Sequence, residues 1–411
     1  MVEEPPAAGS CCLTLTQETD TPSARPGYLS RVAEGLSSVF LDCSSGEPTL
    51  PEARAAWETA ATSGWGDPRR LHRPGRLASQ ALDSVRERVA THVGARPDEV
   101  VLTGPLAPTV QAAVAGLALG RRRTGSTVVT SSVEHSAVLA AAAAVGAVQV
   151  PVDRLGRLDL DAWTEAVGRP GVALACLQVA NHEVGTLQPY AAAADACRAA
   201  GVPLVLDATT ALGRVDTTDL GAWSVLVGWA GAFGGPASVG FMVVRRGTRW
   251  RAPYPADDHQ QGRWPGVVDV PAAWSAAAAL DAVVADRDTV AERQRALVDR
   301  LREGVALRVP DVDLAGDPVA RVPHLLTFSA LYVDGEALTL ELDRAGFAVA
   351  SGSACSAGSE HPSHVLAAMG ALTHGNVRVG LTRTTTEADV EAFLDVIPGV
   401  VAEIRARLGA S

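Results

Sequence analysis

Lysine is missing from this chain: none of its 411 residues is lysine, and the 35 residues counted as lysine or arginine are all arginines. A coding bias toward GC-rich codons lowers lysine content, but it would seldom remove a lysine that catalysis required. The absence excludes one kind of chemistry. A covalent imine with an aldehyde needs a primary side-chain amine, which the guanidinium group of arginine does not provide.

Long apolar and long basic runs are missing as well. A membrane-spanning helix needs about 18 or more apolar residues in a row, and the chain has no such stretch. The acidic start MVEEPPAAGSCC lacks the basic segment of a signal peptide. The longest basic cluster is Arg121–Arg123, in a chain of net charge −11, so nucleic-acid binding is not expected. We expect a cytoplasmic protein without a membrane or nucleic-acid partner.

Cysteines are few and scattered. They form no CxxC pair and no spacing typical of zinc ligands, so no metal site is predicted. Reduced thiols, as in a cytoplasmic protein, are expected. The six cysteines are Cys11, Cys12, Cys43, Cys176, Cys197 and Cys355.

From about residue 40, short runs rich in valine and leucine alternate with alanine-rich helical segments. Nearly continuous apolar runs are typical of strands covered on both faces, and strand–helix alternation indicates βαβ units. We therefore predict an α/β fold with a mostly parallel seven-stranded sheet. The predicted strands span residues 99–103, 127–130, 148–152, 172–178, 203–207, 224–228 and 240–244.

The pattern changes after about residue 270, where one long helical run, 271–305, is followed by shorter apolar segments and a final helix from Thr386. We predict three parts from this change. They are a flexible leader over residues 1–30, a large α/β domain over 31–270, and a small C-terminal α+β domain over 271–411 that also takes up part of the N-terminal segment.

A loop rich in glycine and serine, Ala350–Ser359, carries Cys355 between small residues. A cysteine in such a loop is accessible, and its thiolate can act as a nucleophile. The alternative interpretation is an inert thiol in a loop without function.

Several segments together resemble the cysteine desulfurases, which belong to the class V aminotransferase group of enzymes that use pyridoxal 5′-phosphate (PLP). In order they are TSSVEHSAV (130–138), ANHEVGTLQP (180–189), LDATTALG (206–213), GGPASVG (234–240), SGSACSAGSEHPSHVLAAMG (351–370) and NVRVGL (376–381). The resemblance extends from about Leu41 to Ala406. It implies the PLP-dependent transferase fold of type I, with a large domain and a smaller α+β domain.

The resemblance also implies roles for individual residues. His135 would stack on the pyridine ring of PLP, Asp207 would pair with the ring nitrogen, and Asn181 would lie near the ring or the substrate. Arg378 would bind a substrate carboxylate. Cys355 would attack a substrate sulfur and carry it as a persulfide. Taken singly, each of these residues could instead have only a structural role.

The chain departs from the family pattern at the same pocket. The His-Lys pair that precedes the Gly-Pro turn, and whose lysine forms the imine, falls here at Gly231 and Ala232. The phosphate-binding loop carries Leu106, Ala107 and Pro108, which remove a hydroxyl group and a backbone N–H.

Two further positions differ. The glutamine that faces the ring hydroxyl is Thr210 here, and the threonine that reaches a neighbouring subunit's phosphate is Val267. Each missing phosphate hydrogen bond is worth about 1.5–3 kcal/mol, so the absence of two or three weakens binding by about 10²–10⁵-fold. PLP is thus implied by resemblance only, without covalent attachment and with weakened binding.

Three functional hypotheses follow. The first is a desulfurase-like protein that handles sulfur through a persulfide on Cys355, with a desulfurase relative or a sulfur carrier as partner. The second is a non-catalytic pseudoenzyme that forms a dimer with an active paralogue instead of a homodimer. The third is an enzyme of the desulfurase or aminotransferase type that uses PLP or another ligand without a lysine.

Overall fold

The computed structural model describes residues 38–255, 257–352, 362–407 and 409, and Val39–Ser411 forms one compact unit. The predicted leader over residues 1–30 lies outside the described residues, as does Cys355.

A central sheet confirms the predicted α/β fold. Within the described residues it has seven strands in the order β2-β8-β7-β6-β5-β3-β4. β8 is antiparallel to both of its neighbours, whereas the other neighbouring pairs are parallel. All seven predicted strands are present, with one or two residues of difference at some ends. They are β2 (Val100–Thr103), β3 (Thr127–Ser131), β4 (Ala147–Val150), β5 (Val172–Gln178), β6 (Leu204–Asp207), β7 (Val225–Trp229) and β8 (Gly240–Val244).

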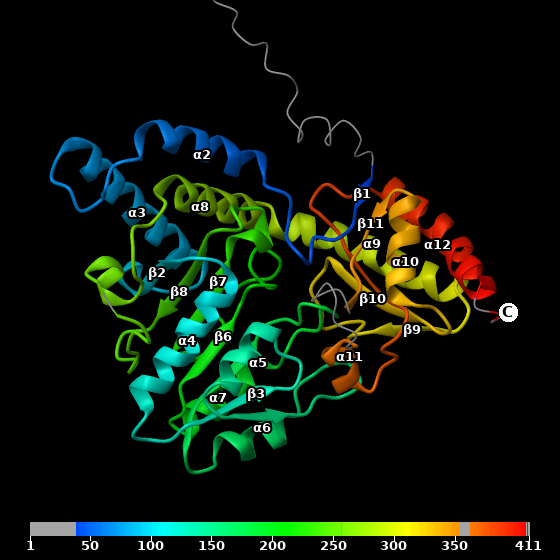
Figure 1. Cartoon of the computed structure of the whole chain (residues 1–411), viewed down its shortest axis with the longest axis horizontal. Coiled ribbons are helices and arrows are strands. Elements are labelled where there is room, and N and C mark those ends of the chain that lie inside the picture. Colours follow the sequence, from blue (N-terminus) through cyan, green and yellow to red (C-terminus); the bar gives the residue numbers. More distant parts are fainter. Residues whose placement is uncertain (1–37, 256, 353–361, 408, 410–411) are drawn as a thin grey trace, which may run out of the picture. The chain divides into compact units, whose positions relative to one another are not determined.

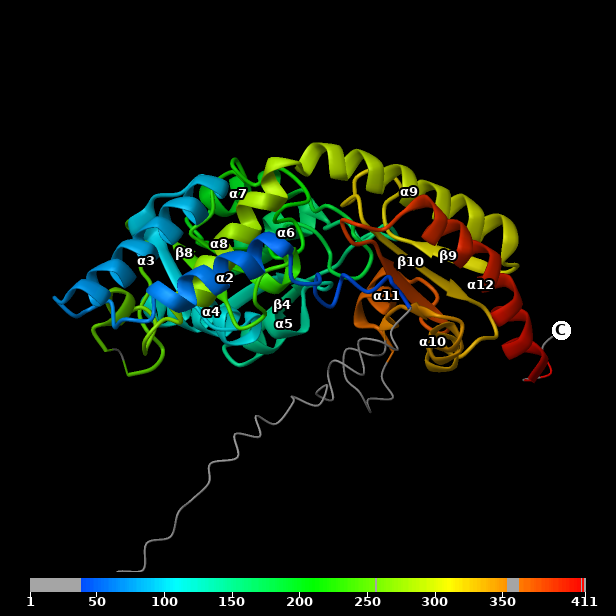
Figure 2. The same ribbon diagram turned by 90° about the horizontal axis from the view of Figure 1, so that it is seen from above.

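Helices cover both faces of this sheet. Along β5, Leu174 and Cys176 belong to one hydrophobic core with α4 and α5, whereas Ala175 and Leu177 belong to another with α3, α6, α7 and α8. Successive side chains of a strand point to opposite faces, which explains the nearly continuous apolar strand sequences. α2, α3 and α8 lie side by side (Figure 2). The helices are α2 (Pro51–Ser63), α3 (Arg73–His92), α4 (Leu106–Arg121), α5 (Ser136–Ala143), α6 (Leu160–Val167), α7 (Tyr190–Ala199) and α8 (Val270–Ala285).

The C-terminal part builds a second hydrophobic core around a three-stranded antiparallel sheet, β12-β10-β9. α9, α10 and α12 lie beside this sheet (Figure 1), and β1 pairs in parallel with β11. The division of the chain at residue 270 stays a prediction. The elements are β1 (Val39–Phe40), α9 (Arg287–Arg308), β9 (Val312–Ala315), β10 (Leu325–Ala330), α10 (Gly335–Arg344), β11 (Phe347–Ala348), α11 (His364–Met369), β12 (Asn376–Gly380) and α12 (Glu387–Arg407).

The helical run predicted over residues 271–305 forms two helices and not one continuous helix. Two helices, α8 and α9, meet at Asp286, whose φ of −120° and ψ of 16° are not helical. The short side chain of Asp286 forms an ion pair with Arg383, far along the chain. This tertiary contact and the low helix propensity of aspartate favour the break, which apolar periodicity alone does not reveal.

In the described part of the chain, no helix combines the length and the apolar character needed to cross a membrane. Three short 3₁₀ segments complete the elements used below. They are η1 (Pro97–Glu99), η2 (Ala230–Phe233) and η3 (His259–Gly262).

Candidate functional site

A cavity of about 360 Å³ lies where the parallel strands of the central sheet end. Gln178, Asp207 and Trp229 are the last residues of β5, β6 and β7, and all three line it. In open α/β sheets, ligands bind at this edge because the loops that follow the strands gather there. The lining residues are Cys43, Ser44, Ser45, Pro105, Leu106, Ala107, His135, Gln178, Ala180, His182, Asp207, Thr209, Thr210, Trp229, Ala232, His324, Leu325 and Arg378.

Arg378 brings a positive charge into the cavity. It lies in β12, whose backbone also pairs with Ala350 through Arg378 N–H to Ala350 O at 2.7 Å and Ala350 N–H to Arg378 O at 3.2 Å. The residue is 5% exposed. Its Nε has no hydrogen-bond partner among the described residues. A buried charge without a partner is costly, so this guanidinium is suited to an anionic ligand.

Asp207 brings a negative charge. It is 7% exposed, and its Oδ1 accepts a hydrogen bond from Thr209 N–H at 2.9 Å, which fixes the carboxylate at the end of β6. Because both Asp207 and Arg378 line the cavity, the site carries one charge of each sign.

Two imidazole rings, those of His135 and His182, also line the cavity. His135 and His182 meet edge to face, with ring centroids 4.8 Å apart. His135 Nδ1 accepts from Ala137 N–H at 3.1 Å and so caps α5. Burial lowers the pKa of His135 and lowers that of His182 well below its usual value. Both rings are therefore neutral near pH 7.

The cavity brings together most of the residues singled out from the sequence: His135, Asp207, Thr210, Ala232 and Arg378 line it. Ala232, where the resemblance would place a lysine, is half-buried and contributes only a methyl group to the wall.

Asn181 lies behind the cavity wall. Its Oδ1 accepts from the backbone N–H groups of Glu183 and Val184, each at 2.8 Å, and its Nδ2 donates to Val133 O at 3.0 Å. These contacts build the turn that presents the next residue, His182, to the cavity. A place for Asn181 near the ring or the substrate stays a prediction; the side chain that lines the cavity is that of its neighbour His182.

Cys355 lies outside the described residues, but the chain on both sides of it is placed. Ala350 pairs with Arg378 as described above, and Ser363 Oγ donates to Glu183 Oε2 at 2.6 Å. The ring centroid of His364 is 6.3 Å from that of His182. The described residues on the two sides, Ala350 and His364, therefore lie near Arg378 and His182, which line the cavity.

Trp229, His324 and Cys43 are among the lining residues that the sequence interpretation missed. Trp229 Nε1 donates to Ala237 O at 2.7 Å, and the indole packs over Gly231. His324 is 4% exposed, and its Nδ1 has no partner among the described residues. Cys43 Sγ donates to Leu381 O at 3.0 Å, and burial raises the pKa of this thiol far above its usual value. The only sequence signal was for Trp229, the aromatic residue that directly follows a predicted strand.

The start of α4 offers little to a phosphate group. Pro105 occupies the N-cap without a side-chain hydrogen bond, and Pro108 has no N–H. Thr109 Oγ1 is directed to Gly104 O at 3.2 Å and to Pro105 O at 2.9 Å. The first turn thus presents the backbone N–H groups of Leu106 and Ala107 but no hydroxyl group.

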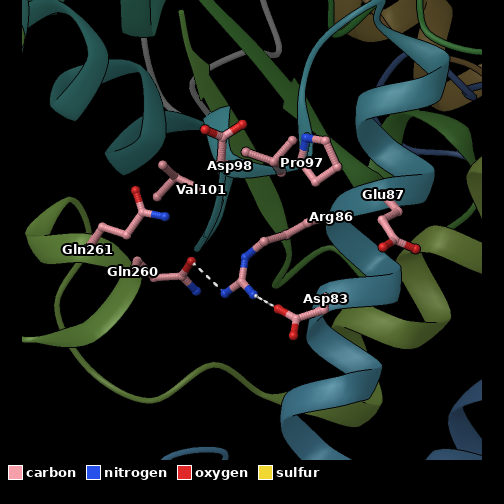
Figure 3. A pocket seen from close by; sticks show the side chains of 9 residues that line it. Asp83, Arg86, Glu87, Pro97, Asp98, Val101, Gln260 and Gln261 are labelled. Carbon is pink, nitrogen blue, oxygen red and sulfur yellow. Dashed lines mark hydrogen bonds and ion pairs between the residues drawn. The ribbon is translucent and has the colours of Figure 1, made fainter. Parts of the chain in front are cut away.

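Val267 lines a different hollow, beside Gly104 and Trp264, and is 60% exposed. A larger cavity, of about 460 Å³, lies between α3, η1 and η3 (Figure 3). In it, Arg86 donates to Asp83 at 2.8 Å and to Gln260 at 3.1 Å. Its guanidinium is therefore already paired, unlike that of Arg378, and none of the residues singled out from the sequence lines this cavity.

No group of three or more His, Cys, Asp or Glu side chains in the described residues could hold a metal ion. The cavity at the strand ends is the candidate functional site, because it gathers most of the residues singled out from the sequence.

The aminotransferase class-V family model matches residues 39–393, so the chain belongs to the class V aminotransferase family. Within that family it is similar to cysteine desulfurases. One, from Cereibacter sphaeroides, is 33% identical over 382 residues, which cover 90% of this chain and 97% of the relative. A cysteine desulfurase IscS from Dictyoglomus turgidum is 30% identical over 377 residues, covering 89% and 95%.

The solved structure of a NifS-like protein is similar to this chain, with a TM-score of 0.82 and 23% sequence identity. The match covers 89% of this chain and 100% of the solved one. This match confirms the fold, and the relatives confirm the resemblance to cysteine desulfurases.

Proposed function

We propose that this protein handles sulfur in the manner of a desulfurase relative, by accepting a sulfur atom on Cys355, without forming an imine with PLP. The thiolate of Cys355 attacks the terminal sulfur of a persulfide. A new S–S bond forms on Cys355 while the S–S bond of the donor breaks, and the donor leaves as a thiolate that takes up a proton. The exchange needs no external oxidant or reductant.

One observation carries this proposal: Arg378, whose buried Nε has no hydrogen-bond partner among the described residues, pairs through its backbone with Ala350, five residues before Cys355 in the sequence. Its guanidinium would hold the carboxylate of a small sulfur compound. After Cys355 in the sequence, Ser363 donates to Glu183 and the ring of His364 lies near that of His182.

The residues present do not fit PLP as the family pattern would hold it. No lining residue has a primary amine, and Ala232 stands where the resemblance places one. The first turn of α4 lacks a hydroxyl group for the phosphate. Trp229 covers Gly231, so a histidine at position 231 would require the indole to move. We infer that PLP is not covalently attached and binds weakly.

The test uses the full-length protein, an active cysteine desulfurase and L-cysteine, followed by mass spectrometry of the cysteine-containing peptides. We expect a mass increase of one sulfur on Cys355 and none in a Cys355→Ser variant. Cys43, Cys176 and Cys197 are buried and serve as internal controls. An unmodified Cys355 in the presence of a working donor would reject the proposal.

A PLP titration separates this function from that of an enzyme using PLP without a lysine. Measured against the same solutions without protein, we expect no additional absorption band at micromolar PLP and no additional spectral change when L-cysteine is added. A band that shifts with L-cysteine would favour the third hypothesis instead.

A second candidate function, a non-catalytic partner of an active desulfurase, is favoured by an apolar surface. Trp57, Trp65, Leu71 and Leu77 lie on or between α2 and α3 and are 45%, 69%, 89% and 42% exposed. Large exposed apolar side chains close together mark protein contacts. Co-purification with a paralogue, together with a change in the catalytic turnover of that paralogue, would support this role. A stable homodimer that binds no paralogue would oppose it.

A further inference from the structure

We propose that a second hollow, at the edge of the central sheet opposite the cavity at the strand ends, binds the oligophosphate group of a small molecule. The hollow has a volume of about 600 Å³, and four arginines line it: Arg121, Arg245, Arg246 and Arg249. An oligophosphate group is the part that inorganic pyrophosphate and nucleoside triphosphates share. The inference goes beyond the proposed sulfur handling and does not depend on it.

The hollow lies where strands of the central sheet begin. Pro203 and Ser224, which directly precede β6 and β7, line it. β8 runs antiparallel to β7, with Val244 opposite Val225, so the turn that follows β8 reaches the same edge of the sheet. A ligand in this hollow would therefore be separated from the cavity at the strand ends by the length of the strands.

Positive charge is concentrated around this hollow, although the net charge of the chain is −11. Two of the four arginines, Arg245 and Arg246, are paired with carboxylates, at 3.2 Å and 2.9 Å. Arg121 and Arg249 form no ion pair in the part of the chain that the structure describes, and none of the described lining residues is acidic. The hollow thus keeps two uncompensated positive charges. A concave surface with charge of one sign concentrates ligands of the opposite sign.

Two of the guanidinium groups are held in place by the protein. Arg245 lies over the ring of Trp223, with Cζ 3.8 Å from the ring centroid, and Trp223 is 6% exposed. Arg121 Nη2 donates to Gly201 O at 3.1 Å. Guanidinium groups that are already held in place lose less conformational freedom when a ligand binds. Their planar shape matches the oxygen atoms of a phosphate group, with which they form paired N–H···O bonds.

The arrangement of the arginines favours a ligand with more than one phosphate group. The two uncompensated charges come from different elements, Arg121 from the end of α4 and Arg249 from the chain that follows β8. An oligophosphate can present a separate phosphate group to each of them, whereas a single phosphate group would fill only a small part of the hollow. We therefore expect affinity to increase with the number of phosphate groups.

The experiment is isothermal titration calorimetry on the full-length protein without added Mg²⁺. The probes are orthophosphate, pyrophosphate, tripolyphosphate, ATP and adenosine. We expect pyrophosphate to bind at least about 10-fold more tightly than orthophosphate, because the second phosphate group adds charge-assisted hydrogen bonds. Raising the salt concentration from about 50 mM to about 500 mM should weaken this binding, because the arginines are partly exposed.

ATP and tripolyphosphate distinguish the two sources of the phosphate groups. Equal affinity for both supports the proposal with an inorganic oligophosphate as ligand, and a higher affinity for ATP supports it with a nucleotide as ligand. Adenosine should not bind. Adenosine that binds as tightly as ATP would overturn the proposal, because the phosphate groups would then contribute nothing.

Variants locate the site. Arg249→Gln and Arg121→Gln should each weaken pyrophosphate binding about 10-fold, the effect of removing one charge-assisted contact. Arg249 is exposed, and its side chain has no hydrogen-bond or ion-pair partner among the described residues, so its replacement should not disturb folding. Arg344→Gln on α10, at a side chain that is 70% exposed, is the matched control and should leave the affinity unchanged. Arg378→Gln, at the other cavity, should also leave it unchanged.

Three results would overturn the inference. The first is equal affinity for pyrophosphate and orthophosphate, and the second is a pyrophosphate affinity that neither Arg249→Gln nor Arg121→Gln changes. The third is binding of poly-L-glutamate without binding of any oligophosphate, which would indicate an acidic protein surface as the partner. None of these results bears on the transfer of sulfur to Cys355, which is measured separately by mass spectrometry.

Discussion

The six-membered ring of the Trp229 indole lies over the α-carbon of Gly231, where a Cβ atom would be only 2.3 Å from Trp229 Cζ2. The indole is held in place by its hydrogen bond to Ala237 O. The two positions therefore depend on each other: an aromatic side chain at 229 requires the absence of one at 231. The shape of this part of the cavity wall therefore depends on both residues.

Gly231→Ala should destabilise the protein by about 1–3 kcal/mol, because overpacking a closed site forces neighbours off their preferred rotamers. The variant Trp229→Ala should relieve this clash, so Gly231→Ala should cost less in that background. Urea unfolding of the two single variants and the double variant measures the coupling energy. Additive effects would show that the indole moves aside freely.

Ala232→Lys should not restore tight PLP binding. The first turn of α4 offers a phosphate group too few donors, and each missing hydrogen bond is worth about 1.5–3 kcal/mol, so the absence of two lowers affinity by about 10²–10⁴-fold. After PLP addition and borohydride reduction, mass spectrometry should show labelling at residue 232 no faster than at Arg198→Lys, which places a lysine on exposed α7. Stoichiometric labelling at residue 232 at low PLP would mean that the phosphate site is intact.

Much of the fold could be predicted from the sequence. Residues 172–178 read as a strand buried on both faces and form β5, because an apolar run of that length is stable in the middle of a covered parallel sheet. The strand predicted over residues 203–207 ends at Asp207, and so does β6. The break at Asp286 was not predictable, because it depends on a tertiary contact with Arg383.

The candidate site was predictable only in part. Motif order identified Asp207 and Arg378, which the fold brings to one cavity from distant parts of the chain. Asn181, which the resemblance would place near the ring or the substrate, is not among the residues that line the cavity, whereas His182 is. No local pattern distinguishes these neighbours, since their orientation follows from the hydrogen bonds of Asn181 with Glu183 and Val133. His324 and Cys43 approach the cavity only through tertiary packing.

Arg214→Met should destabilise the protein strongly. Arg214 is 5% exposed and forms an ion pair with Glu47, which is 7% exposed and also accepts from Arg383 N–H at 2.9 Å. Removing one partner of a buried pair leaves an uncompensated charge and costs about 3–5 kcal/mol. The measurement is the free energy of unfolding in urea. The double variant Arg214→Met with Glu47→Gln should recover part of the loss, and Arg198→Met at an exposed pair should cost much less.

Glu134→Gln should change how stability depends on pH. Glu134 is fully buried, and burial raises the pKa of its carboxyl group from 4.5 to about 8. Between these two values the unfolded chain releases the proton while the folded chain keeps it, so the stability of the folded state falls as the pH rises through this window and levels off above it. Glutamine carries no proton to release and can keep the hydrogen bond that Oε1 accepts from Gln178 N–H.

The Tm of the Glu134→Gln variant relative to the unaltered protein should therefore rise steadily between pH 5 and pH 8, as measured by differential scanning calorimetry. Glu165→Gln, at a carboxylate whose side chain is 71% exposed, is the matched control and should show no such trend. A constant difference between Glu134→Gln and the unaltered protein across this range would mean that Glu134 is ionised in the folded state.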